Sequence, residues 1–239
     1  MKVAIIAASL LAAAQSVFAH TYLDHIVLPG GANGDCVRHT SQWTTGQRNY
    51  PIKDLTSENM ICGFAPTQPA AQRCPITAGS KLGLIFGHDR PGDDIIAASH
   101  WGACNIYLAA QPANGGVPTG ADWFKIQEEG YPNGKWCTSR LIETKGLLDV
   151  TLPSNLPSGK YLLRAEIGAL HEADTLFTQN PARGLQLYVY CAELTVTGSG
   201  NANFSPKVDF PGAITYQSPG VLFNVYAPFN SYPTFGPAI

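Results

Sequence analysis

Alternation of hydrophobic and polar positions along this chain predicts a protein built mainly from β-strands. Runs of apolar, β-branched and aromatic residues, separated by stretches rich in Gly, Pro and Asn, are expected to be strands at residues 22–28, 81–86, 104–109, 146–152, 160–167 and 185–196. Helical periodicity is limited to a short expected helix within residues 54–60. Regularly spaced strands with long loops predict an all-β fold, an immunoglobulin-like or fibronectin III-like antiparallel β-sandwich.

The two ends of the chain have patterns of their own. Lys2, the apolar run that follows it, and the small residues Val17 and Ala19 indicate a secretory signal peptide over residues 1–19, cleaved after Ala19. Residues 205–239 are rich in Pro, Gly, Tyr and Phe and are expected to be extended chain packed on the sandwich. We therefore expect a secreted, monomeric protein with a single domain over residues 20–239 and no carbohydrate-binding module.

Composition and charge narrow the class of protein further. The net charge of −2 gives no basic surface for nucleic acid, and no apolar stretch after the signal reaches the roughly 18–20 residues of a membrane helix. The 6 cysteines fit an oxidising compartment and favour disulfides over a zinc site, but they allow 15 pairings. The Asn203-Phe204-Ser205 sequon predicts glycosylation at Asn203.

Histidines provide the candidate metal ligands. Most histidines are surface or internally hydrogen-bonded residues, but cleavage after Ala19 would make His20 the first residue. His20 could then chelate a metal ion through its α-amine and its imidazole together. His100 precedes an expected strand, and His171 follows another and lies next to Glu172.

The expected strand at residues 185–196 places polar side chains on one face. Because strand side chains alternate, Gln186, Tyr188 and Tyr190 share a face, and Leu187, Val189 and Cys191 share the other. The Gln/Tyr face either contributes to a functional site or simply satisfies itself by internal hydrogen bonds.

Several stretches together resemble the fungal lytic polysaccharide monooxygenases of auxiliary activity family nine. Besides His20, they are residues 49–62 (NYPIKDLTSENMIC), 93–108 (DDIIAASHWGACNIYL), 161–174 (YLLRAEIGALHEAD), 180–191 (NPARGLQLYVYC) and 208–226 (VDFPGAITYQSPGVLFNVY). Residues 100–104, His-Trp-Gly-Ala-Cys, depart from the Gly-Pro that many relatives have there. The resemblance implies a β-sandwich whose long loops form a flat substrate surface.

The resemblance also implies a copper centre. His20, His100 and the axial Tyr188 would be the metal ligands, and nitrogen ligands suit copper. Gln186 would hydrogen-bond the oxygen reactant, and His171 would assist proton delivery. The implied activity is oxidative cleavage of β-1,4-glucosidic bonds in cellulose, related β-glucans or cello-oligosaccharides, with O₂ or H₂O₂ and an external reductant. The stretches around His171 and Asn180 resemble members that oxidise C4.

Further residues are assigned by the same resemblance. The expected substrate contacts border the copper site in related proteins and are Tyr50, His88, Glu172, Asp174, Arg183 and Tyr232, the last as a surface tyrosine. The widespread disulfide of the family would join Cys62 to Cys191. The other four cysteines can then pair in three ways, and we favour the one that joins Cys104 to Cys137.

Two other functions remain open at this point. A noncatalytic secreted β-sandwich that binds cell-wall polysaccharide would not need His20 or Tyr188. A zinc hydrolase would use three histidines and a bound water, but Glu172 beside His171 is too little to provide its general base.

Overall fold

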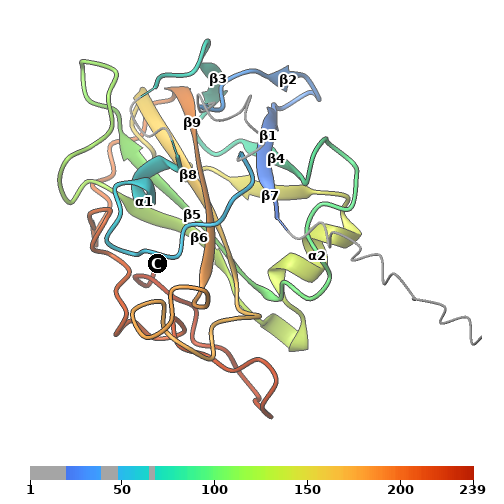
Figure 1. Ribbon diagram of the computed structural model, residues 1–239. Helices are drawn as coiled ribbons and strands as arrows, with labels where there is room; N and C mark the ends of the chain where they lie inside the picture. Colours follow the sequence, from blue (N-terminus) through green and yellow to red (C-terminus); the bar gives the residue numbers. More distant parts are fainter. Residues whose placement is uncertain (1–19, 39–47, 65–67) are drawn as a thin grey trace, which may run out of the picture.

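Two β-sheets pack face to face in the computed structural model, which describes residues 20–38, 48–64 and 68–239 (Figure 1). The expected signal peptide lies outside the described residues. One sheet has the order β2 (Asn33–Gly34), β1 (Tyr22–Val27), β4 (Lys81–Gly87), β7 (Leu147–Thr151). The other has the order β3 (Cys74–Thr77), β9 (Gln186–Thr197), β8 (Gly159–Ala169), β5 (Gly102–Ala110), β6 (Phe124–Glu129). The β-sandwich is confirmed.

One edge of the five-stranded sheet differs from the antiparallel expectation. The short strand β3 runs parallel to β9, pairing Cys74 with Leu194 and Thr77 with Thr197. A turn in which Ser80 N donates to Thr77 O then leads directly into β4 of the other sheet. The direction of β3 is therefore set by this crossing between sheets rather than by a hairpin.

The predicted strands correspond to β1, β4, β5, β7, β8 and β9, whereas the short or edge strands β2, β3 and β6 were not predicted. Two further elements were also missed, the helix α2 (Cys137–Glu143) and the 3₁₀ turn η2 (Pro132–Gly134). The expected helix at 54–60 is displaced to α1 (Asn59–Cys62). Asp54 Oδ1 accepts a hydrogen bond from Thr56 N, and Ser57 Oγ accepts one from Asn59 N, so side chains hold this segment in turns.

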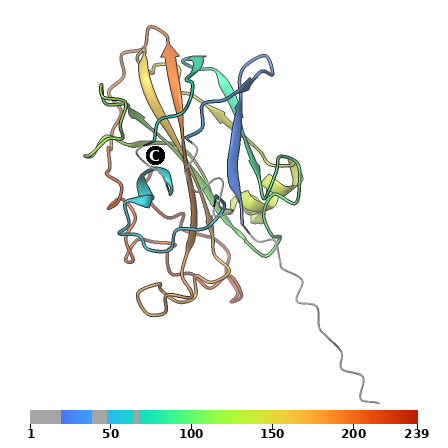
Figure 2. The same ribbon diagram turned by 45° about the horizontal axis from the view of Figure 1, so that its top comes forward.

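Both faces of the five-stranded sheet are buried, each against a different covering. The inner face, with Ile167, Tyr188 and Ala192, packs on the four-stranded sheet. The outer face, with Leu187 and Val189, is covered by α1 and the C-terminal segment, as Figure 2 shows from the side. Residues 205–239 are turns and extended chain, as expected.

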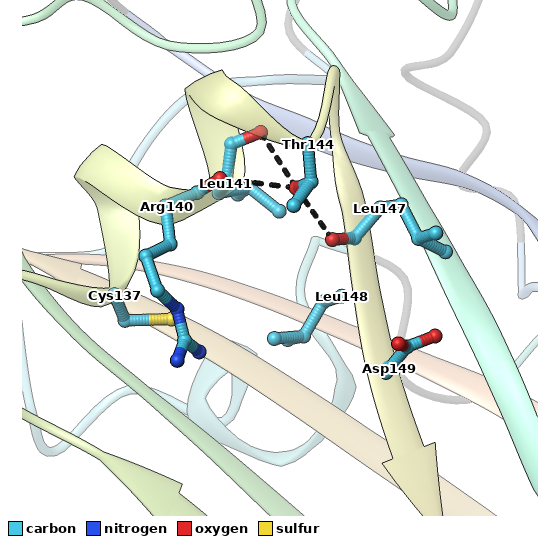
Figure 3. Close-up of a pocket in the computed structure, with 7 residues that line it drawn as sticks. All are labelled: Cys137, Arg140, Leu141, Thr144, Leu147, Leu148 and Asp149. Carbon is cyan, nitrogen blue, oxygen red and sulfur yellow. Dashed lines mark hydrogen bonds between the residues drawn. The ribbon is translucent and has the colours of Figure 1, made fainter.

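Three disulfides join these layers: Cys36–Cys74, Cys62–Cys191 and Cys104–Cys137. Cys62–Cys191 is the pair that the resemblance implied, and Cys104–Cys137 is the pairing that we favoured among the remaining cysteines. Cys62–Cys191 fixes α1 to β9, and Cys104–Cys137 fixes α2 to β5. Between α2 and β7 lies a hollow of ≈ 380 Å³, whose lining includes Arg140, Leu148 and Asp149 but none of the histidines discussed above (Figure 3). No helix in the described segments is long and apolar enough to cross a membrane.

Candidate metal centre and substrate surface

His20, His100 and His171 are neighbours at one end of the sandwich. The rings of His100 and His171 stack with their centroids 3.7 Å apart and their planes 27° from parallel. The ring of His20 belongs to the same group. Burial lowers the pKa of His20, with smaller contributions from the rings of His88 and His171, and burial lowers the pKa of His100, with smaller contributions from the rings of His171 and His20. Three residues from distant parts of the sequence thus form one cluster.

Strand register explains why His100 meets His171. In the antiparallel pair β5–β8, Gly102 lies opposite Ala169, and two more residues of the same register bring position 100 opposite position 171. The hydrogen bond from Leu170 N to Trp101 O, 2.8 Å, extends the pairing toward the histidines. A Cβ atom at Gly102 would lie 1.6 Å from Gly168 O, so only glycine permits this close approach.

The backbone beside His20 is held by Tyr190 of β9. The Tyr190 hydroxyl lies 2.9 Å from Thr21 O and 2.8 Å from Arg48 O. The Thr21 hydroxyl in turn donates to Gly87 O at 3.3 Å. Tyr190 was placed on the Gln/Tyr face by sequence periodicity without a role, and the structure shows that it anchors the start of β1.

A chain of hydrogen bonds links the remaining polar residues of that face. The Tyr188 hydroxyl donates to Gln186 Oε1 at 3.0 Å, and Gln186 Nε2 donates to Glu172 Oε2 at 2.7 Å. The Tyr188 ring centroid lies 6.0 Å from that of His20. The internal hydrogen bonds considered from the sequence therefore exist, and they belong to side chains that also face the histidine cluster.

Burial keeps the site neutral. It lowers the pKa of His100 to about 3, helped by the neighbouring rings of His171 and His20. Burial also lowers the pKa of His20, and it lowers that of His171 despite the opposing charge of Glu172. The pKa of the Tyr188 phenol is raised by burial, so the hydroxyl stays protonated.

The unpaired ring nitrogens fit a metal ion. His100 Nε2 and His171 Nδ1 are buried and have no hydrogen-bond partner among the residues that the structure describes. A buried polar atom without a partner is costly, and a neutral imidazole nitrogen is a good ligand for copper. The donor set around His20 and His100 therefore fits the copper ion that the sequence predicts.

The expected substrate contacts lie around this cluster with different exposures. Tyr50 is 47% exposed, and its ring centroid lies 5.4 Å from that of His20. Asp174 and Arg183 form a partly exposed ion pair on the loop between β8 and β9. His88 is largely buried, with Nδ1 3.1 Å from a carboxylate oxygen of Asp89.

The expectation that Tyr232 is a surface tyrosine is wrong. Tyr232 is 9% exposed, its hydroxyl donates to Gly220 O at 2.9 Å, and its ring packs edge-on against Trp136. The C-terminal segment folds back over the ring, which a sequence cannot reveal.

Besides Tyr50, a second exposed tyrosine lies beside the cluster, Tyr226, which sequence reasoning did not single out. It is 62% exposed, and its hydroxyl donates to His171 O at 3.2 Å. The sequence quoted around Tyr226 contains several aromatic residues, and nothing in it distinguishes the exposed ring from the buried ones.

The fold and this cluster define the class of protein, a β-sandwich with a histidine-rich candidate metal centre at one end of its sheets. The model of Auxiliary Activity family 9 (formerly GH61) matches residues 20–234. The chain belongs to this family.

Proteins similar to this chain carry the name AA9 family lytic polysaccharide monooxygenase, a class of copper-dependent oxidoreductases. One from Armillaria gallica is 39% identical over 216 residues, covering 90% of this chain and 84% of that protein. One from Collariella virescens is 38% identical, covering 95% and 83%. Two from strains of Aspergillus fumigatus are 38% identical over 97% of this chain, which spans 64% of their length.

Solved structures agree with this assignment. The structure named CvAA9A superposes with a TM-score of 0.85 at 36% identity and covers 92% of this chain and 97% of that chain. Cel61B from Hypocrea jecorina, with a TM-score of 0.75 at 23% identity, has the same fold.

Proposed function

We propose that this chain, secreted and cleaved after Ala19, is a copper-dependent lytic polysaccharide monooxygenase. It cleaves β-1,4-glucosidic bonds oxidatively in cellulose, related β-glucans or cello-oligosaccharides, acting as a monomer with an external reductant. The observation that carries the proposal is the unpaired, buried Nε2 of His100 beside His20. The match to the family begins at residue 20, which supports the cleavage site.

The metal would be held by His20, through its α-amine and imidazole, and by His100 through Nε2. Copper bound there supplies one-electron redox chemistry toward an oxygen reactant. Tyr188 stays protonated, so its neutral hydroxyl would be available to the copper ion as a further ligand. His171 is neutral and its Nδ1 has no partner in the described chain, so it can accept and pass on a proton.

Gln186 is oriented for its role by its neighbours. Its Oε1 accepts from Tyr188 and one hydrogen of Nε2 is donated to Glu172, so the second Nε2 hydrogen can point to the oxygen reactant. Glu172, a proposed substrate contact, also accepts this hydrogen bond and so supports the proposed role of Gln186. Tyr50, with the Asp174–Arg183 pair, remains the proposed contact surface for the polysaccharide, and C4 the proposed position of oxidation.

The other two functions receive less support. A zinc hydrolase needs a free general base, and the carboxylate next to His171 in the chain, that of Glu172, is engaged by Gln186 Nε2. A noncatalytic polysaccharide-binding protein has no use for neutral histidines with unpaired nitrogens. A single experiment separates these cases from the monooxygenase.

The test incubates the copper-loaded mature protein with ascorbate and either cellulose or cello-oligosaccharides, and identifies products by mass spectrometry. We expect sugars oxidised at C4 and a 1:1 copper signal in electron paramagnetic resonance spectra. His20→Ala and a protein with one extra residue before His20 should both be inactive. His25→Ala is the matched control, because His25 pairs with Asp24 outside the cluster. Only unoxidised sugars, or a stoichiometric preference for zinc, would refute the proposal.

A further inference from the structure

A hollow of ≈ 450 Å³ lies beside the histidine cluster. Its lining combines four aromatic rings with two polar side chains: Trp101, Tyr131, Trp136 and Phe229, with Lys135 and Ser139. It is formed where the segment around η2 and α2 meets the C-terminal segment. The volume falls in the range of about 300–1,000 Å³ typical of small-ligand sites.

Trp101 connects this hollow to the histidine cluster. It directly follows His100 in the chain and is half-buried. Its ring makes an edge contact with the exposed ring of Tyr226, with the centroids 6.0 Å apart at 64°. Tyr226 in turn donates a hydrogen bond to His171 O. The rim of the candidate metal centre and the wall of the hollow are therefore continuous.

The aromatic lining is preformed. Trp136 packs against Tyr131 at 4.6 Å and against Phe229 at 5.8 Å between ring centroids, so the rings hold one another in place. A site that needs no ordering on binding loses less free energy to conformational entropy.

The polar groups indicate a neutral ligand with hydroxyl groups. The Lys135 ammonium is paired with Glu143 at 2.5 Å, so its charge is already compensated and an anion gains little. The remaining N–H and O–H donors of Lys135 and Ser139 can hydrogen-bond sugar hydroxyls while the rings contact C–H faces.

We propose that this hollow is an accessory saccharide subsite, which binds a neutral glucosyl unit of the same β-glucan chain at a distance from the bond that is cleaved. The inference rests on the proposed polysaccharide function. Trp101 is the specificity-determining residue, because it alone belongs to both the hollow and the segment that carries His100.

The test measures binding by the metal-free mature protein, so that it is independent of oxidation. Isothermal titration calorimetry compares cellobiose with cellohexaose, and nuclear magnetic resonance follows the Trp101 indole N–H signal, assigned with Trp101→Phe. Cellohexaose should bind the wild type at least about tenfold more tightly than cellobiose and shift the indole signal. Trp101→Ala should lose this gain, with about five- to tenfold weaker cellohexaose binding, while Trp101→Phe keeps most of it.

Phe204→Ala is the matched control, because Phe204 stacks on Phe124 of β6 and does not line the hollow. It should bind cellohexaose as the wild type does, and melting curves check that every variant folds. Unchanged cellohexaose binding by Trp101→Ala would overturn the subsite, even if the wild type oxidises cellulose. A change in sedimentation of Trp101→Ala without a change in saccharide affinity would also overturn it, in favour of contact with a second copy of the chain.

Discussion

Among the regions of this molecule that bury polar side chains, two treat them in opposite ways. Beneath the C-terminal segment, Arg164 and Glu166 are fully buried and paired at 2.5 Å. Arg164 also donates to Met60 O, and its guanidinium lies over the Phe210 ring. In the histidine cluster, His100 is also buried, with 4% of its surface exposed, but its Nε2 has no partner in the part of the chain described.

The difference follows from what covers each region. The outer face of the five-stranded sheet is covered by the short helix α1 and by irregular chain, whose free carbonyl groups need donors. Arg164 supplies them to α1, and Asn105 Nδ2 donates to Phe235 O at 3.2 Å. The pair of Arg164 and Glu166 therefore supports the fold, whereas the unpaired nitrogen of His100 costs stability and, under the proposed function, is left for the copper ion.

The largest expected effect is on copper binding by the histidine cluster. His100→Ala should weaken copper binding by about three orders of magnitude, equivalent to about 4 kcal/mol, because one nitrogen ligand is lost. The metal-free variant should unfold at a denaturant concentration close to that of the wild type, because His100 Nε2 makes no hydrogen bond within the described chain. Copper titration calorimetry and urea unfolding check the two parts. A large loss of stability without a loss of copper affinity would mean that His100 supports the fold and does not bind the metal ion.

The next largest effect is on stability, when the buried ion pair of Arg164 and Glu166 is broken. Arg164→Met should lower the free energy of unfolding by about 3–5 kcal/mol, because it leaves the Glu166 carboxylate buried without its partner. Copper affinity of the folded variant should stay within about twofold. Adding Glu166→Gln should recover at least about 1 kcal/mol in urea unfolding, since the uncompensated charge is then removed. No recovery in the double variant would mean that packing on Phe210, not charge, is what Arg164 contributes.

A pH titration sharpens the same contrast. The pKa of His100 falls from 6.5 to about 3 on folding, so below pH 6.5 the unfolded chain takes up a proton that the folded metal-free protein does not. Stability should therefore decline as the pH falls from 6.5 toward about 3. His100→Ala isolates the effect, because the stability of the wild type relative to this variant should fall over that range. A difference between the two proteins that is independent of pH would contradict it.

The smallest expected effect concerns orientation within the site. Glu172→Gln weakens the charge-assisted hydrogen bond to Gln186 Nε2 and should reduce kcat by roughly three- to tenfold, with copper affinity changed less than about twofold. Asp174→Asn, which alters the exposed pair with Arg183, should raise KM instead. Initial rates on a soluble cello-oligosaccharide separate the two. If Glu172→Gln and Asp174→Asn raised KM equally and left kcat unchanged, Glu172 would act as a substrate contact and not as a support for Gln186.

Much of the fold could be predicted because strand alternation is a local property of the sequence. The period of two places Gln186 and Tyr188 on one face of β9, and the register of β8 with β9 agrees. The strands β2, β3 and β6 were missed because they are short or lie at sheet edges. The helix α2 was also missed, since its stability depends on the Cys104–Cys137 disulfide and on burial of Leu141 rather than on a long periodic pattern.

By itself the sequence singled out His20, through its predicted cleavage site, and one polar face of β9, through strand alternation, whereas the set of candidate ligands rested on the family resemblance. Only the tertiary structure decided which groups lie together. Register brings His100 onto His171, and the folding back of the C-terminal segment buries Tyr232 while leaving Tyr226 exposed. These outcomes depend on contacts between residues distant in the chain, which local pattern does not encode.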